Sequence, residues 1–458
     1  MNEQLIGLLR AQALGEVVVP GGATFAKASS IWNSRLQGVP GAILRCEGEG
    51  DVSMAINLAR QHQVPVTVRS GGHSYAGLSS LRGGLVIDLT PLQKVQVDPV
   101  AQRALVGPGS RWGHVCEETL RHGLATTTGT VTTVGIGGYT LGGGTGWLAR
   151  LHGLSLDNLV AAEIVTADAE IRSVNESRHP DLFWAVRGGA GNFGVVTEME
   201  FQLHQIPQQV FAGQAIFPFS EARRGFELYR EVMPSLPDAF TCYPAIIRIP
   251  PVPAFPEVWH GQLGFAYILC HVGDTVEGEA LARPFLDLGQ PILKSVGPRS
   301  YLEVQKFFDA GVPDGQRWFS RAHYLDALSD GAISTILEHV IHMPGAFSFV
   351  YLEPLGGAIA LVPPEATAFP HRKAAYGFHI LAGWPEAAED AAALEWTRKF
   401  HDAMEPHANG SVYVNLLAED EADRIPSAYG SNYERLRKIK AKWDPDNLFR
   451  RNQNIPPK

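Results

Sequence analysis

Residues 69–77 read Arg-Ser-Gly-Gly-His-Ser-Tyr-Ala-Gly and lie between two apolar runs, residues 64–68 and 85–89, that are typical of short strands. Two adjacent glycines allow the backbone to adopt positive φ angles and to approach a ligand closely. Successive N–H groups in such a turn can form a nest that binds an anion. His73 follows the glycines directly, so we expect it to contact whatever the nest holds. Taken alone, it is equally compatible with a loop histidine bonded to backbone.

Two further glycine-rich segments follow, residues 129–146 and 188–194. The first holds eight glycines in eighteen residues, so we expect tight turns that wrap a ligand rather than a long helix or strand. Residues 189–194 match the GxGxxG pattern of nicotinamide-binding Rossmann folds, which requires a strand before it and a helix after it. Here a helical pattern precedes the match and a strand pattern follows it. This reversed order argues against a nicotinamide site and favours a tight turn beside a cofactor.

The composition indicates a globular enzyme of two or three domains, with 458 residues, 45% apolar and 19% charged. A net charge of −9 argues against a nucleic-acid partner, because phosphate binding needs clustered Lys and Arg. No run of about 18 apolar residues predicts a membrane span, and residues 1–10 lack the apolar region of a signal peptide. Four cysteines without CxxC spacing indicate free thiols in a reducing cytoplasm, not a metal cluster or a disulfide framework.

Residues 40–110 alternate between strand and helix patterns, which indicates an α+β fold. Asp51 is the expected N-cap of a helix that ends before residue 64. After residue 207 glycine loops become rare and aromatic residues and prolines frequent, with candidate strands at 347–352 and 376–381. We therefore expect a second domain built on an antiparallel sheet. Near the end of the chain, residues 433–443 have the apolar spacing of an amphipathic helix.

The motifs taken together are more specific than any one of them. Residues 69–73 (RSGGH), 134–138 (VGIGG), 157–158 (DN), 187–197, 369–372 (FPHR) and 447–455 (NLFRRNQNI) resemble, in order and spacing, the berberine-bridge-enzyme-like branch of the vanillyl-alcohol oxidase superfamily. The resemblance covers roughly residues 20–456. It implies a PCMH-type FAD-binding domain at 1–207, a substrate domain at 208–415, and a segment at 416–458 that returns to the FAD domain.

The resemblance also implies a covalent flavin. In that family the histidine matching His73 is bonded to the flavin 8α-methyl group. Many relatives add a second bond from a cysteine, but Val131 stands at the matching position, so we expect a single link through His73. Further cofactor contacts are implied for Arg69, Ser70, Gly71, Gly72, Ser74, Gly77, Gly129, Thr130, Thr133, Val134, Gly135, Gly138, Gly142, Gly146, Gly194, Val196 and Asn452.

Val134 matches the family position over the flavin face that oxygen must approach. Valine there goes with oxidases and the bulkier leucine with dehydrogenases, so O₂ is the expected electron acceptor. The steric argument is that one added methylene closes a small void.

The catalytic base is left open between two residues. The family's catalytic tyrosine often ends a Tyr-x-Asn-Tyr motif, but here the motif reads Tyr413-Val414-Asn415-Leu416, with leucine in place of the base. Tyr429 is one candidate, although a tyrosine with a pKa near 10 needs activation. His379 is the other, on a strand whose alternate side chains are expected to point at the substrate. Each of the two residues is also compatible with a packing role that has no part in catalysis.

We therefore expect a cytoplasmic FAD-linked oxidase that transfers a hydride from an alcohol, a sugar or natural-product hydroxyl, to the flavin and yields H₂O₂. Alternatives are C–N oxidation of an amine, oxidative C–C or C–N bond formation, a dehydrogenase with another acceptor, and a flavin carrier without turnover. The expected partners are a small-molecule substrate and O₂, with no nucleic acid and no membrane. The sequence leaves the substrate's identity and the oligomeric state open.

Overall fold

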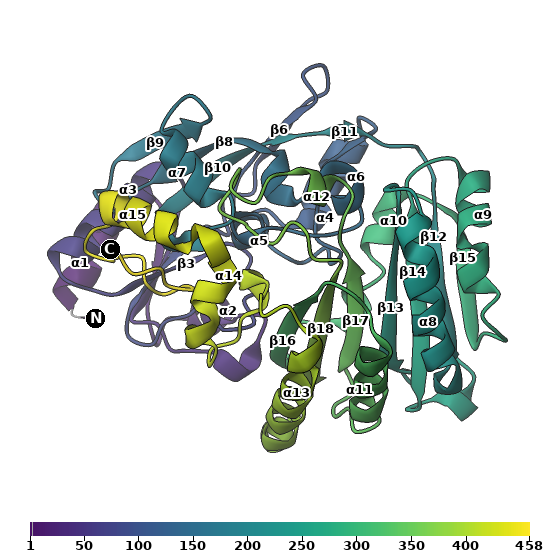
Figure 1. Ribbon diagram of the computed structural model, residues 1–458. Coiled ribbons are helices and arrows are strands. Elements are labelled where there is room, and N and C mark those ends of the chain that lie inside the picture. Colours follow the sequence, from purple (N-terminus) through teal and green to yellow (C-terminus); the bar gives the residue numbers. More distant parts are fainter. Residues whose placement is uncertain (2) are drawn as a thin grey trace.

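The computed structural model describes residue 1 and residues 3–458 (Figure 1). It confirms an α+β fold in which a glycine-rich N-terminal unit packs beside a separate antiparallel sheet. Within the described residues, no helix is both long and apolar enough to cross a membrane.

A small sheet carries the first glycine-rich loop. Its strand order is β1-β2-β4-β3; β2, β4 and β3 run parallel, and β1 is antiparallel at the edge. The strands are β1 (Glu16–Val18), β2 (Ala42–Arg45), β3 (Val66–Arg69) and β4 (Leu85–Asp88). Its helices are α1 (Glu3–Gln12), α2 (Phe25–Ser29) and α3 (Glu49–Gln61), and α1 and α3 share an apolar core with the sheet. Residues 69–77 therefore leave the carboxyl end of β3, where parallel sheets place ligands.

A second, antiparallel sheet has the order β5-β6-β10-β8-β9. Its strands are β5 (Val95–Asp98), β6 (Arg103–Val106), β8 (Leu159–Val165), β9 (Ile171–Asn175) and β10 (Val195–Gln202), and the short pair β7 (Leu124–Ala125) and β11 (His204–Gln205) lies apart from it. The helices between the strands are α4 (Trp112–Leu120), α5 (Ile136–Gly142), α6 (Ala149–His152) and α7 (Pro180–Val186).

A seven-stranded antiparallel sheet forms the second unit, in the order β15-β12-β14-β13-β17-β18-β16. The strands are β12 (Val210–Pro218), β13 (Phe240–Arg248), β14 (Leu263–His271), β15 (Leu293–Arg299), β16 (Arg317–Leu325), β17 (Phe349–Pro354) and β18 (Tyr376–Trp384). Its helices are α8 (Ala222–Val232), α9 (Thr275–Leu286), α10 (Tyr301–Gln305), α11 (Asp330–Val340), α12 (Ala358–Leu361) and α13 (Asp390–Met404). Helices α8, α11 and α13 lie along one face of this sheet (Figure 1), which leaves side chains of β17 and β18 on the other face for the site.

The chain then returns to the first unit through α14 (Ile425–Tyr429) and α15 (Tyr433–Trp443), which packs against α7. In Figure 1 this last segment lies beside the N-terminal strands and helices. The fully buried Lys440 ammonium holds the return in place: it donates to Asp444 at 2.6 Å and to the carbonyls of Asn192 and Phe449. A buried cation paired in this way is costly to unpair, so it fixes the position of the C-terminal tail.

Two local predictions need correction. Asp51 is not an N-cap, because α3 begins at Glu49; its carboxylate instead accepts hydrogen bonds from the backbone N–H groups of Leu14, Gly15 and Glu47. Residues 129–146 contain the helix α5 where turns were predicted. A Cβ on Gly137 or Gly142 of α5 would collide with Ser70 or Asn415, and this close packing outweighs the poor helix propensity of glycine.

Candidate active site

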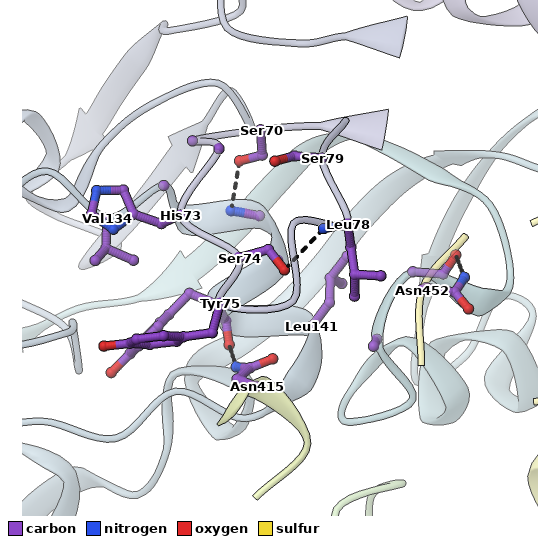
Figure 2. A pocket seen from close by; sticks show the side chains of 18 of the residues that line it. Ser70, His73, Ser74, Tyr75, Leu78, Ser79, Val134, Leu141, Asn415 and Asn452 are labelled. Carbon is purple, nitrogen blue, oxygen red and sulfur yellow. Dashed lines mark hydrogen bonds between the residues drawn. The ribbon is translucent and has the colours of Figure 1, made fainter. Parts of the chain in front are cut away.

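A deep cleft lies between the first unit and the free face of the seven-stranded sheet. Its cavity volume is about 330 Å³, within the roughly 300–1,000 Å³ of most small-molecule pockets. All three glycine-rich segments, β17, β18 and the C-terminal tail contribute lining residues. Figure 2 shows His73 beside Val134 towards one end of the cleft and Asn452 towards the other. Because residues of both units line it, a ligand in the cleft would contact the glycine-rich loops and the sheet at the same time.

His73 is held in a fixed orientation at the cleft wall. Its ring stacks on Trp32, with 4.9 Å between ring centroids, and its Nε2 lies 3.0 Å from Thr133 Oγ1. Burial, helped by the charge of Arg111, lowers the pKa of His73 to about 3. The imidazole is thus neutral at physiological pH and keeps a lone pair on one ring nitrogen.

The loop that carries His73 has a row of backbone donors without an acceptor. Among the described residues, none accepts a hydrogen bond from the backbone N–H groups of residues 71–75. Gly72 adopts φ +74°, and a Cβ there would meet only the distant Arg69 side chain. Such a series of unpaired N–H groups is a nest for an anion, which suits a pyrophosphate.

Other groups along the cleft are also unpartnered within the described part of the chain. The Ser79 Oγ and the Asn452 Oδ1 are buried, belong to lining residues and have no hydrogen-bond partner. A Cβ on Gly138 would have no heavy atom of the described residues within 4 Å, so the space beside it is open. Buried polar groups normally have partners, so these residues fit a ligand that carries phosphate and hydroxyl groups, as FAD does.

Most of the residues expected to contact a cofactor line the cleft. The lining set contains Ser70, Gly71, Gly72, His73, Ser74, Gly129, Thr130, Val134, Gly135, Gly138, Gly194, Val196 and Asn452.

Five expected cofactor contacts lie behind this surface and support it: Arg69, Gly77, Thr133, Gly142 and Gly146. Arg69 donates to the backbone carbonyls of Ser79 and Ala28, and Thr133 bonds to His73. A Cβ on Gly77, Gly142 or Gly146 would collide with Leu36, Asn415 or the Thr128 carbonyl, respectively. Their role in the structure is close packing of the loops rather than contact with the cleft.

The opposite wall carries a carboxylate beside an imidazole. His379, on β18, stacks on Tyr351 of β17 with 4.5 Å between centroids. Its Nε2 lies 3.3 Å from Glu353 Oε2 without hydrogen-bond alignment, and both ring nitrogens are buried without a partner in the described structure. All three side chains line the cleft. Glu353 and His379 are therefore placed to accept and hold a proton from a bound molecule.

Two further polar residues of the C-terminal segment complete this wall. The Tyr413 hydroxyl accepts hydrogen bonds from the Gly144 N–H at 2.8 Å and from Asn415 Nδ2 at 2.9 Å. Burial is the main cause that raises the pKa of Tyr413 and of Tyr351, and the Glu353 carboxylate adds to it. Both phenols thus stay protonated at neutral pH and can act as hydrogen-bond donors.

Tyr429, the other candidate base, does not line the cleft. It is buried on α14, stacks near Tyr433, and has a hydroxyl without a partner among the described residues. Burial raises its pKa as well. Its position in the helix leaves it without contact to a molecule in the cleft.

The flank of His73 is aliphatic. Val131 and Val134 line the cleft, and Val131 also packs against the cluster of Trp32, Val312 and Trp318. The four cysteines are buried and free, and none of them lines the cleft. No thiol is therefore placed to form a second bond to a molecule held there.

Glu353 is not among the residues that the sequence predicts for the site. It lies in the run Tyr-Leu-Glu-Pro at residues 351–354, where the period of two places it on the same face as Tyr351. A lone carboxylate in an otherwise apolar strand was the available signal, because a buried charge is rare without a function. Its proximity to His379 arises only from the pairing of β17 with β18.

Comparison with known proteins identifies the fold and the chemistry. The family models for an FAD binding domain and for berberine and berberine-like proteins match residues 40–175 and 412–456. (R)-6-hydroxynicotine oxidase of Paenarthrobacter nicotinovorans is 32% identical over 466 residues, which cover 97% of each chain. The chain belongs to the berberine-bridge-enzyme-like family of FAD-linked oxidoreductases. The first unit, with its glycine loops, is the PCMH-type FAD-binding domain of this family.

Further family members show the same architecture with different substrates. The crystal structure of 6-hydroxy-D-nicotine oxidase from Arthrobacter nicotinovorans superposes with a TM-score of 0.87 at 29% identity, covering 97% of this chain and 98% of that one. Xylooligosaccharide oxidase of Thermothelomyces thermophilus is 27% identical over 455 residues, covering 94% of this chain and 90% of that relative. By their names, one acts on an amine and the other on a sugar. This berberine-bridge-like chain is thus an FAD-linked oxidoreductase of a family that serves both substrate classes.

Proposed function

We propose that the protein is an oxidase that removes a hydride from an alcohol carbon, with FAD bonded covalently to His73 and O₂ as the final electron acceptor. The hydroxyl belongs to a sugar or a natural product, and H₂O₂ is the second product. The observation that carries this proposal is the Glu353–His379 pair on the cleft wall. FAD supplies the hydride acceptor, the N5 atom of its ring system.

Residues of the first unit would hold the cofactor. The free N–H groups of residues 71–75 suit the pyrophosphate, and the unpartnered Asn452 Oδ1 suits a hydroxyl further along. Because His73 Nε2 faces Thr133, Nδ1 is the ring nitrogen left for the bond to the 8α carbon. No cysteine lies in the cleft, which supports a single link.

Glu353 is the proposed base. Oxidation of an alcohol requires removal of the hydroxyl proton as the hydride leaves carbon, and a positioned base contributes about 10²–10⁴-fold to such a step. The tyrosines of the wall have raised pKa values, so they cannot accept that proton. Glu353 accepts it, and the adjacent His379 stabilises the proton there. Tyr413 is placed to orient the substrate as a hydrogen-bond donor.

Oxidation of an amine is the second candidate, and the same carboxylate favours it. Glu353 is 6% exposed and its nearest basic group is the misaligned His379, so a substrate ammonium would compensate its charge. The 32% identity to a nicotine oxidase supports this candidate too. The four buried thiols support a reducing, cytoplasmic location.

The deciding experiment is an anaerobic substrate screen that follows bleaching of the bound flavin, repeated in air with H₂O₂ detection. We expect sugars or other alcohols to bleach the flavin and to release H₂O₂. Glu353→Gln should lower kcat by about 10²-fold or more while the flavin content stays unchanged. Glu365→Gln, at an exposed carboxylate of the same unit, is the matched control. If only amines bleach the flavin, the alcohol proposal is wrong and the amine candidate replaces it.

The covalent bond has its own test. Wild-type protein precipitated in acid should keep its yellow colour, and His73→Ala should lose it to the supernatant. Retention of flavin in the His73→Ala pellet would show that another residue forms the bond.

A further inference from the structure

We propose that Thr133 and Asp314 are positioning residues that prepare His73 for its bond to the flavin, by holding the ring proton on Nε2 and leaving the lone pair on Nδ1. The inference rests on the proposed covalent link and concerns how that link forms. Neither residue lines the cleft, so both act through His73.

Both groups face the same ring nitrogen. Thr133 Oγ1 lies 3.0 Å from His73 Nε2, and Asp314 Oδ1 lies 3.9 Å from the same atom. A carboxylate can only accept a hydrogen bond, and a hydroxyl can accept one. With both at Nε2, the tautomer that carries its proton there is the favoured one, and Nδ1 keeps the lone pair.

The ring plane is fixed as well. Trp32 stacks on His73 with 20° between the planes, and Trp318 stacks on the other face of Trp32 at 4.8 Å between centroids. The Trp32 indole N–H donates to the Val312 carbonyl. His73 therefore cannot turn to exchange its two nitrogens without disturbing this stack.

Asp314 belongs to the second unit, in the segment 309–316 that crosses over the His73 loop. Asp309 accepts hydrogen bonds from the N–H and the hydroxyl of Thr132 at 2.8 and 2.6 Å, and the Gly315 N–H donates to the Trp32 carbonyl. The carboxylate thus reaches His73 only when the two units are docked. Attachment of flavin would then be favoured after both units have folded.

A bond forms between Nδ1 and the 8α carbon, that carbon loses one hydrogen as a proton, and two electrons pass into the flavin ring. The imidazole, now alkylated on Nδ1, is cationic until it releases the Nε2 proton. O₂ then accepts the two electrons and two protons as H₂O₂, which restores the oxidised flavin.

The cationic imidazole that attachment produces needs neighbouring groups that stabilise its charge. Burial, and after it the charge of Arg111, oppose a positive charge on the His73 ring and lower the pKa of His73 to about 3. Thr133 bonds to the cationic ring through its oxygen, and the Asp314 carboxylate attracts it. Asp314 is 62% exposed, so it can also pass the released proton to solvent.

The test follows the covalent bond directly and does not depend on turnover. The full chain, purified with incomplete flavin, is incubated with FAD, and the acid-stable flavin is measured over time by absorbance and by intact mass. Thr133→Val should slow attachment about tenfold or more, and Thr133→Ser should restore it. Asp314→Asn should slow it about two- to fivefold, as expected for an exposed charge pair, with rescue by Asp314→Glu.

Thr275→Val, at the first residue of α9 and away from both the His73 loop and the segment 309–316, is the matched control. It should attach flavin at the wild-type rate. Total FAD binding and melting temperature, measured for each variant, separate slow chemistry from lost folding. Attachment by Thr133→Val at the wild-type rate, or equal slowing in Thr133→Ser, overturns the inference. Failure of the underlying link shows differently: wild-type protein without acid-stable flavin, or His73→Ala protein that retains it.

Discussion

Val134 lies beside His73 on the aliphatic flank of the cleft, half-buried against the first unit (Figure 2). Val134→Leu adds one methylene where O₂ would approach the flavin. We expect reoxidation of the reduced flavin by O₂ to slow about tenfold or more, a barrier increase of about 1.4 kcal/mol. Reduction by substrate should be unchanged, because the substrate binds at the opposite wall. Stopped-flow absorbance measures the two half-reactions separately.

Val131→Leu is the control for this variant, since Val131 lines the same flank but packs against Trp32. A Val134→Leu protein that still reacts with O₂ at the wild-type rate would show that the size of residue 134 does not limit the approach of O₂.

Single residues differ in how far the sequence reveals them. His73 could be identified because its neighbours along the chain, two glycines, carry the signal. Glu353 could not, because its significance depends on His379, which is adjacent only through the register that pairs Tyr351 with His379. Tyr429 had an aromatic side chain in a suitable motif, but the helix α14 places it outside the cleft.

At the scale of elements, the site depends on a contact between the His73 loop and the start of α5. Gly71 and Gly135 meet backbone to backbone, and a Cβ on either glycine would collide with the other. Gly135→Ala should therefore lower the free energy of unfolding by about 1–3 kcal/mol, as overpacking does, and should also weaken FAD binding. Urea unfolding and flavin titration measure the two effects.

Gly138, one turn further along α5, gives the contrast. Its Cβ would meet no atom of the described structure within 4 Å, so Gly138→Ala should leave the unfolding free energy equal or raise it by up to about 1 kcal/mol. Since it lines the cleft, the same change should weaken FAD binding. Equal stability of the Gly135→Ala and Gly138→Ala proteins would contradict this account of the loop contact.

Elements with a strong local pattern were predicted well, and those decided by distant contacts were not. The helix over residues 433–443 and the strand that begins at residue 376 are confirmed. The cap assigned to Asp51 was wrong because backbone donors at residues 14 and 15, far away in sequence, compete for its carboxylate. The helix α5 was missed because glycine disfavours helices unless close packing requires it.

At the scale of the whole molecule, buried ion pairs join segments that are far apart in sequence. The Arg372 guanidinium binds both oxygens of Asp157, at 2.6 and 2.9 Å, and so links the second unit to the first. The Lys440 ammonium, which is paired locally with Asp444, joins the C-terminal segment to the turn at Asn192 by donating a hydrogen bond to the Asn192 carbonyl. Such pairs contribute specificity of docking more than stability, and nothing in the local sequence patterns indicates them.

Acid sensitivity is the property of the whole molecule that follows most directly from its buried histidines. His152 stacks on His204, and His323 stacks on His401, at 3.8 and 4.1 Å between centroids. Burial, followed by the charge of the stacked partner, lowers the pKa of His152 to about 4 and that of His323 to about 3. In the unfolded chain both have a pKa near 6.5.

Below about pH 6.5 the unfolded state therefore binds more protons than the native state. The contribution of these two histidines to the unfolding free energy is fully present above that pH and is lost as the pH decreases towards 4. Between pH 7.5 and 5.5 the two groups together should cost about 2–3 kcal/mol. Urea unfolding followed by tryptophan fluorescence measures this difference. His323→Gln should remove about 1.4 kcal/mol of the dependence, because His73 and the other buried histidines keep their own contributions, whereas His342→Gln, at an exposed position, should leave it intact. Equal unfolding free energies at the two pH values would mean that these buried rings accept protons without unfolding.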